Sequence, residues 1–153
     1  MPFRYVLPVL LASIALLAQP AGAENSSPAS SPLGRWKTID DITGKAKSIV
    51  LIWEENGKLF GKVQRLVNPD PKNPNPRCED CSGDQKGKPV VGLQILQNLS
   101  KDGNNWSGGT ILDPATGKIY KCLVSVLDGG AKLKVRGFIG VSLLGRTQYW
   151  QRE

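Results

Sequence analysis

Near its C-terminal end the chain carries Arg136-Gly137-Phe138-Ile139-Gly140-Val141-Ser142-Leu143-Leu144-Gly145-Arg146-Thr147-Gln148-Tyr149-Trp150. The stretch mixes strand-forming residues with regularly placed glycines, and glycine weakens a strand unless the strand bends, bulges or lets another backbone approach. We therefore predict curved, well-packed strands here. A counterpart, Gly34-Arg35-Trp36, stands near the start of the predicted folded region. We expect the last strand to close a curved sheet onto this first one.

Short strand-like runs separated by turn signals lie between these two segments. The Asn56-Gly57 pair favours a tight hairpin, and residues 113–118 have the composition of a second turn. Regular short strands with local turns predict an all-β antiparallel up-and-down meander that closes into a small barrel of about eight strands. The predicted strands cover residues 35–39, 48–53, 59–67, 106–112, 119–127, 132–139 and 147–152.

Alternation along two of these strands indicates one buried and one wet face. Residues 120, 122, 124 and 126 share an apolar face, and residues 133, 135, 137 and 139 do the same on the next strand, with Lys132, Lys134 and Arg136 opposite. Residues 68–89 are dense in Pro, Asn, Lys and Asp and predict one long loop. Residues 90–99 fit either a strand or a short helix followed by a strand.

The first 23 residues have the pattern of a secretory signal peptide. Arg4 precedes an apolar run over residues 6–18, and Ala21-Gly22-Ala23 offers a small-x-small cleavage site before Glu24. The apolar run is shorter than the about 20 residues that span a membrane. No cysteine follows it closely, which argues against a lipoprotein anchor. We expect a periplasmic or secreted protein without an integral membrane segment in its mature form.

Removal of the signal peptide would leave a Ser- and Pro-rich flexible tether over residues 24–32 and one domain over residues 33–153. The whole chain carries 20 basic and 13 acidic residues, and the loss of Arg4 would leave a net charge of +6. The lysines are scattered, and no basic run alternates with aromatic residues. The sequence therefore does not predict a nucleic-acid partner, and it does not specify an oligomeric state.

The chain contains no histidine. This removes the commonest general base, the usual Ser-His pair and most zinc sites. The paired carboxylates Asp40-Asp41 and Glu54-Glu55 both fall at predicted turns, where we expect them to be solvated. The sequence thus predicts a protein that is not an enzyme, with no metal site and no cofactor.

Three cysteines leave alternatives open. Cys78-Glu79-Asp80-Cys81 is a C-x-x-C pair, which fits a disulfide that pins the long loop, a thiol oxidoreductase or part of a metal site. The two acidic residues between the thiols would oppose thiolate formation, so we favour the disulfide. Cys122 would then be a buried free thiol, although a bridge from Cys122 to one of the pair also fits.

The arginines of the closing stretch have separate interpretations. In a closed barrel the first and last strands are neighbours, so Arg146 or Arg152 would lie over the ring of Trp36 and, with Gly34, shut one end. Arg136 precedes a glycine and would meet an anionic headgroup if it faced the interior. The alternation favours an outward, solvated Arg136.

Several blocks resemble one known family. They are Gly34-Arg35-Trp36-Lys37-Thr38 with Asp40-Asp41, Leu59-Phe60-Gly61-Lys62-Val63, Pro89-Val90-Val91-Gly92-Leu93, Trp106-Ser107-Gly108-Gly109 with Asp113-Pro114, Gly117-Lys118-Ile119-Tyr120 and the closing stretch. Together they run through nearly all of residues 33–152. The chain resembles the DUF2147 family of exported bacterial proteins of unknown function. The resemblance implies a small lipocalin-like β-barrel with no established activity, and the C-x-x-C loop resembles one present in part of the family.

These observations lead to three hypotheses. The first is a binding protein that holds a small apolar or amphipathic ligand inside the barrel. The second is a structural or stress-related interaction protein with a filled barrel, and the third is a thiol redox protein that uses Cys78 and Cys81. For the first hypothesis the predicted ligand-binding residues are Trp53, Phe60, Leu93, Tyr120, Arg136 and Phe138.

Overall fold

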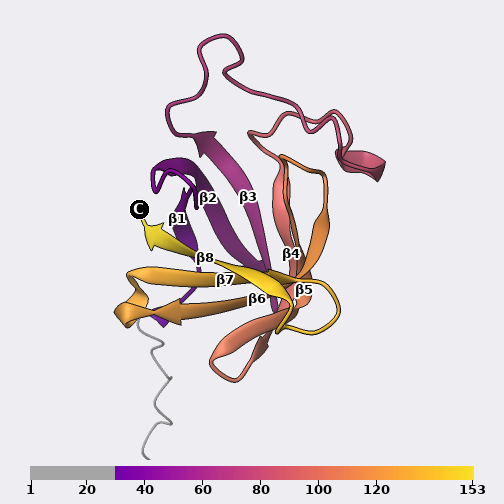
Figure 1. The fold of residues 1–153 in the computed structure, drawn as a ribbon. Coiled ribbons are helices and arrows are strands. Elements are labelled where there is room, and N and C mark those ends of the chain that lie inside the picture. Colours follow the sequence, from indigo (N-terminus) through magenta and orange to yellow (C-terminus); the bar gives the residue numbers. More distant parts are fainter. Residues whose placement is uncertain (1–29) are drawn as a thin grey trace, which may run out of the picture.

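Eight antiparallel strands form one closed barrel in which each strand pairs with its neighbours in sequence (Figure 1). The computed structural model describes residues 30–153, so the predicted signal peptide and its cleavage site at Ala23 and Glu24 lie outside the described residues. The all-β, up-and-down barrel predicted from the sequence is confirmed. The strands are β1 Gly34–Ile39, β2 Ala46–Glu55, β3 Lys58–Leu66, β4 Gln94–Asp102, β5 Asn105–Leu112, β6 Ile119–Leu127, β7 Lys132–Phe138 and β8 Gly145–Arg152, with 3-10 turns η2 Gly83–Gln85 and η3 Asp128–Gly130.

The last strand closes the barrel onto the first. β8 pairs with β7 along its whole length, and its final residues pair with β1 through Trp36 opposite Arg152 and Lys37 opposite Gln151. An open sheet exposes unpaired backbone groups at its edges, and closure removes both edges. The short β1–β8 seam therefore completes the hydrogen bonding of the sheet.

Local sequence explains the β2–β3 turn, whereas the structure decides the form of segment 90–99. Asn56 and Gly57 both have positive φ angles, 51° and 74°, as a tight turn between β2 and β3 requires. The ambiguous segment 90–99 divides: Val90–Leu93 turns back along the end of β3 through backbone hydrogen bonds to Val63, and β4 begins at Gln94. The long loop thus covers residues 67–93, slightly more than predicted.

The barrel has a filled half and a hollow half. The closed half lies toward the β2–β3, β4–β5 and β6–β7 connections and is packed with large buried side chains. These include Trp36, Ile52, Leu59, Leu99, Leu133 and Trp150. The open half lies toward the β1–β2, β3–β4, β5–β6 and β7–β8 connections. The sequence left open a filled barrel and a hollow barrel, and the structure combines a filled half with a hollow half.

Arg152 plugs the closed end. Its guanidinium lies 4.1 Å from the centre of the Trp36 ring. It also donates hydrogen bonds to the carbonyl oxygens of Gly130 at 2.6 Å, Leu33 at 3.0 Å and Ser31 at 2.6 Å. The last residues of the predicted tether therefore contact the barrel, and one cation joins two separate segments, residues 31–33 and the β6–β7 connection, to the β1–β8 seam.

The expectation that Arg146 would help to shut this end is wrong. Arg146 stands six residues before Arg152, and a strand rises about 3.3 Å per residue, so the two arginines occupy opposite ends of β8. Arg146 pairs with Asp41 of the β1–β2 loop at the open end.

Replacement of Arg152 tests the plug. Arg152→Lys keeps the charge but removes the fork that reaches three carbonyl groups, and we expect the free energy of unfolding to fall by about 2–3 kcal/mol. Arg35→Lys is the matched control, because the exposed Arg35 only pairs with Glu153, and it should cost less than about 1 kcal/mol. Urea unfolding measures both, and equal losses in the two variants would contradict the plug.

Candidate functional site

A cavity of about 1020 Å³ occupies the open half of the barrel, where the four open-end connections meet. Its wall is mainly apolar, and its volume is at the upper end of the about 300–1,000 Å³ found for small-molecule sites. The inward-facing side chains of the open half line this space, and no core residue fills it. The apolar wall includes Val63, Leu66, Val90, Ile95, Ile111, Leu112, Val135 and Trp150.

A chain of polar side chains crosses one side of this cavity. Trp150 donates its indole N–H to Gln148 Oε1 at 3.1 Å, and Gln148 donates from Nε2 to Asp41 Oδ2 at 3.1 Å. The same carboxylate oxygen of Asp41 pairs with the guanidinium of Arg146. Arg146, Gln148 and Trp150 alternate along β8 opposite Gly137, Val135 and Leu133 of β7, which places all three on the inner face.

A second polar group lies between β1 and β2. The hydroxyls of Thr38 and Ser48 are 2.7 Å apart, both residues are buried, and both line the cavity. Beside them the loop carboxylate of Asp40 accepts hydrogen bonds from Thr43 and Ile42. These hydrogen bonds, chiefly from Thr43, hold the pKa of Asp40 below its ordinary value. The wall thus offers hydrogen-bonding groups at fixed positions within an apolar surface.

Two of the six predicted ligand-binding residues line the cavity. Tyr120 points inward from β6, and Phe138 stands at the end of β7 beside the opening. Trp53 and Phe60 do not line it. They are paired across β2 and β3 and stack on each other with ring centres 5.8 Å apart, while the neighbouring pair Ile52 and Gly61 faces inward. The expectation that they line the cavity is corrected by the register of this hairpin.

Leu93 and Arg136 are also outside the cavity wall. Leu93 is buried in the core cluster where the long loop enters β4. Arg136 lies on the outer face of β7 opposite Thr147, the side that the alternation favoured. Its guanidinium donates to the carbonyl oxygens of Ser142 at 2.6 Å and Leu143 at 3.1 Å and to the Thr147 hydroxyl at 2.7 Å. Arg136 therefore holds the β7–β8 loop.

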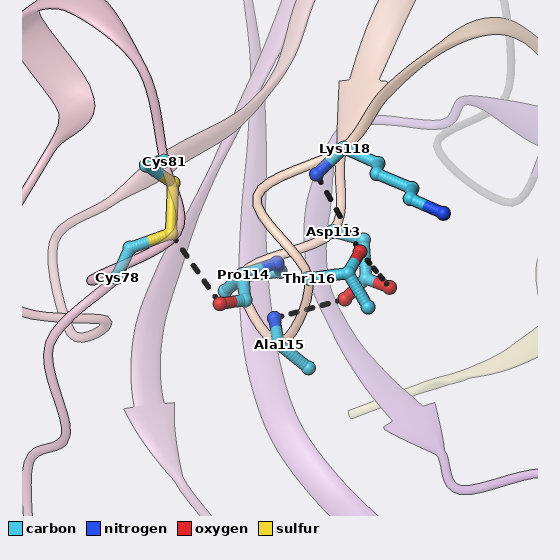
Figure 2. Close-up of a disulfide and its surroundings, with 7 residues drawn as sticks. All are labelled: Cys78, Cys81, Asp113, Pro114, Ala115, Thr116 and Lys118. Atoms are coloured by element: carbon cyan, nitrogen blue, oxygen red, sulfur yellow. Dashed lines mark hydrogen bonds between the residues drawn. A yellow bond between two sulfur atoms is a disulfide. The ribbon is translucent and has the colours of Figure 1, made fainter.

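The C-x-x-C pair forms a disulfide that sits against the β5–β6 turn (Figure 2). Cys78 and Cys81 are buried, and Cys78 Sγ lies 3.3 Å from the carbonyl oxygen of Pro114. Gly117 has φ +68°, and a Cβ built there would stand 2.0 Å from the carbonyl oxygen of Asp80. Only glycine permits this approach, so the turn and the disulfide loop form one wall of the cavity mouth.

The third cysteine, Cys122, is an unreactive free thiol. Cys122 is buried on the inner face of β6, and desolvation raises its pKa to about 12. A reactive thiol requires access and a lowered pKa. Cys122 therefore lacks both features of a reactive thiol.

Sequence reasoning missed the polar chain of Asp41, Gln148 and Trp150 and the pair Thr38 and Ser48. Alternation along β8 carried a usable signal, because Gln148 has the same parity as the apolar Trp150. No sequence pattern pointed to Asp41, since its partner Arg146 is more than 100 residues away along the chain. Loops are placed by the tertiary fold, and their contacts do not follow from strand patterns.

Within residues 30–153, no helix has the length and apolar character needed to cross a membrane. The described part of the chain also has no group of three or more His, Cys, Asp or Glu side chains that could hold a metal ion.

Comparison with known proteins identifies the family. The family described as "Uncharacterized protein conserved in bacteria (DUF2147)" matches residues 34–152, and the chain belongs to this family. Among solved structures it is similar to protein HP1028 from the human pathogen Helicobacter pylori, which is described as belonging to the lipocalin family. The two share 21% identity over 79% of this chain and 82% of that one, with a TM-score of 0.68. No curated protein matches the chain. The barrel is thus lipocalin-like in fold.

The contact between the disulfide loop and the β5–β6 turn is tested at Gly117. Gly44 has nearly the same φ, +67°, but nothing within 4 Å of a built Cβ. We expect Gly44→Ala to cost about 1 kcal/mol for the left-handed backbone and Gly117→Ala to cost a further 1–3 kcal/mol, approximately, for the clash. Thermal unfolding measures the difference, and limited proteolysis should cut residues 67–93 faster only in Gly117→Ala. Equal behaviour of the two variants would refute the contact.

Thiol titration tests the cysteine assignment. With Ellman's reagent at pH 8 we expect no reactive thiol in the native protein, because the pKa of Cys122 is raised and its sulfur is buried. Unfolding without a reductant should expose one thiol, and unfolding with prior reduction should expose all three cysteines. Two or three reactive thiols in the native protein would show that the disulfide is absent or labile.

Proposed function

We propose that this member of the DUF2147 family is an exported binding protein that holds one small apolar or amphipathic ligand in the open half of its barrel. The observation that carries the proposal is the cavity of about 1020 Å³ with a mainly apolar wall and a few polar groups. Ligand sites commonly combine these two features, since apolar contact supplies affinity and sparse hydrogen bonds fix the orientation. The lipocalin description of the structural neighbour is consistent with this use of the fold.

The division of the barrel favours binding over a purely structural role. A structural barrel has no need of an unfilled half, because an empty apolar volume forfeits packing contacts. The closed half is packed around Trp36 and Trp150, so the loss is confined to one end. The packed half gives a rigid floor, and Trp150 serves both as part of that floor and as part of the cavity wall.

The polar chain indicates where a polar end of the ligand would lie. Asp41, Gln148 and Arg146 stand at the mouth, and the Arg146 side chain is 67% exposed. An apolar tail would then occupy the space between β4, β5 and β7, with the polar end among these three side chains. A buried polar end without such partners would be costly.

Export is part of the proposal. The signal-peptide pattern of residues 1–23 supports it, and so does the Cys78–Cys81 disulfide, since disulfides persist mainly in oxidising compartments. The proposed location is the periplasm or the exterior of a bacterial cell.

A binding role is proposed in preference to catalysis. The hydrogen bonds that lower the pKa of Asp40 make its carboxylate a weaker base, and burial keeps Cys122 protonated. Neither shift moves a group toward the neutral range in which general acid–base catalysts work best.

Filling the cavity tests ligand binding. Gly137 lines the cavity, and a Cβ there makes ordinary contacts at 3.4 Å or more with Ile111 and Tyr120, so Gly137→Leu should fold while its added side chain takes up cavity space. With N-phenyl-1-naphthylamine as fluorescent probe, we expect the dissociation constant of the Gly137→Leu variant to be about tenfold higher than that of the parent protein. Lys134→Leu is the matched control, because it adds the same side chain on the outer face of β7 and should leave binding unchanged.

Equal binding by the two variants, or no binding by the parent protein, would contradict a ligand site in the cavity. Native mass spectrometry of protein prepared gently from its own cells can detect the natural ligand as an added mass. A reproducible added mass that Gly137→Leu loses and Lys134→Leu retains would identify the class of ligand.

A further inference from the structure

Exposed apolar side chains gather at the mouth of the barrel. Four belong to the β7–β8 loop, residues 139–144, which Figure 1 shows as a curved connection beyond the ends of β7 and β8 and which carries no charged side chain. Their exposed fractions reach 87% at Leu143 and 73% at Leu144. Large apolar side chains gathered at this exposure mark an interaction site more often than an ordinary surface. We call this set the apolar rim: Ile42, Ile119, Ile139, Val141, Leu143 and Leu144.

The rim is continuous with the cavity. Ile42, Ile139 and Leu144 are exposed and also line the cavity. The ion pair between Arg146 and Asp41 ties the β1–β2 loop, which carries Ile42, to the start of β8. The apolar surface therefore runs from the inside of the barrel over its lip to the outside.

Part of the backbone of the β7–β8 loop is hydrogen-bonded within the protein. Arg136 occupies the carbonyl oxygens of Ser142 and Leu143, and backbone hydrogen bonds join Leu144 to Val141 and Ile139 to Leu144. Unpaired backbone groups are what makes a loop costly to place in lipid. The guanidinium of Arg136 lies at the base of the loop, at the depth where headgroups would meet it if the tip entered the acyl region.

Cations flank the rim and outnumber the unpaired carboxylates of the β1–β2 and β5–β6 turns. Lys45, Lys118 and Lys121 are exposed and enter no ion pair within residues 30–153. Asp41 is paired with Arg146, whereas Asp40 and Asp113 keep their charge and accept hydrogen bonds within their own turns. Without Arg4 of the predicted signal peptide, the formal net charge of the chain is +6. An apolar projection surrounded by free lysines complements a surface with an apolar interior and anionic headgroups.

From these observations we propose that the apolar rim docks on the surface of an anionic phospholipid bilayer, with the β7–β8 loop entering the boundary between headgroups and acyl chains. A second copy of the chain fits less well. A stable protein interface uses about 20–30 residues a side with close shape complementarity, whereas the rim is a few side chains on a projecting turn. Docking would turn the cavity mouth toward the lipid, but it does not depend on the proposed ligand.

Co-sedimentation with sucrose-loaded vesicles tests the docking. The protein begins at Glu24, so that the apolar run of residues 6–18 contributes nothing, and it retains the whole closed barrel. We expect binding to vesicles of phosphatidylethanolamine with phosphatidylglycerol, weaker binding to phosphatidylcholine alone, and a loss at high salt. Val141→Asp with Leu143→Asp, two exposed rim residues that do not line the cavity, should reduce the partition coefficient at least about tenfold. Lys118→Glu with Lys121→Glu should reduce it about tenfold on the anionic vesicles only.

Tyr149→Asp is the matched control, because Tyr149 is an exposed apolar side chain on the outer wall of β8, away from the rim. It should bind as the parent does. Every variant is required to keep its unfolding midpoint and its binding of N-phenyl-1-naphthylamine, so that failure of docking is separated from failure of the ligand site. Equal loss in Tyr149→Asp and the Val141/Leu143 variant would overturn the proposal. So would self-association that the Val141/Leu143 variant abolishes without vesicle binding by the parent, since the rim would then be an interface between copies.

Discussion

Closure of β8 onto β1 is the constraint on which the rest of the structure depends. The seam is short, and its hydrogen bonds alone would leave a frayed edge. Arg152 strengthens it by lying over Trp36 and binding three carbonyl groups from segments far apart in the chain. Once this end is shut and packed, the four connections at the other end surround the cavity of about 1020 Å³ that the core leaves unfilled.

The two arginines of β8 show how one strand can serve both ends of the barrel. Arg146 and Arg152 have the same parity, so both face inward, but they stand at opposite ends of β8. At the closed end the cation stacks on a tryptophan and satisfies backbone oxygens. At the open end it meets the carboxylate of Asp41, next to the amide of Gln148. Arg152 thus stabilises the closed end of the barrel, and Arg146 adds a charged group to the wall of the cavity.

The open end is built from connections with contrasting chemistry. The disulfide loop is fixed against the β5–β6 turn by an approach that only Gly117 allows, which gives one side of the mouth a rigid wall. The β7–β8 loop instead projects apolar side chains, while Arg136 satisfies its carbonyl groups from outside. The proposed ligand site and the proposed lipid contact are therefore formed by adjacent parts of one structure, and neither uses the chemistry of a thiol enzyme.

The sequence by itself determined the all-β class, the tight turn at Asn56-Gly57 and the alternation of β6 and β7, because these depend on local turn geometry and on a period of two. The sequence also suggested that the last strand pairs with the first, but the tertiary structure decided the register that places Trp36 opposite Arg152. The sequence did not determine which side of β2 faces inward. Residues 49–53 are apolar without alternation, so only the register with Gly61 shows that Ile52 is inside and Trp53 outside. The contact of Asp41 with Arg146 and the collection of the apolar rim at one end were likewise decided by the tertiary structure. Both depend on loops that closure of the barrel brings together from distant parts of the chain, and no local pattern records that proximity.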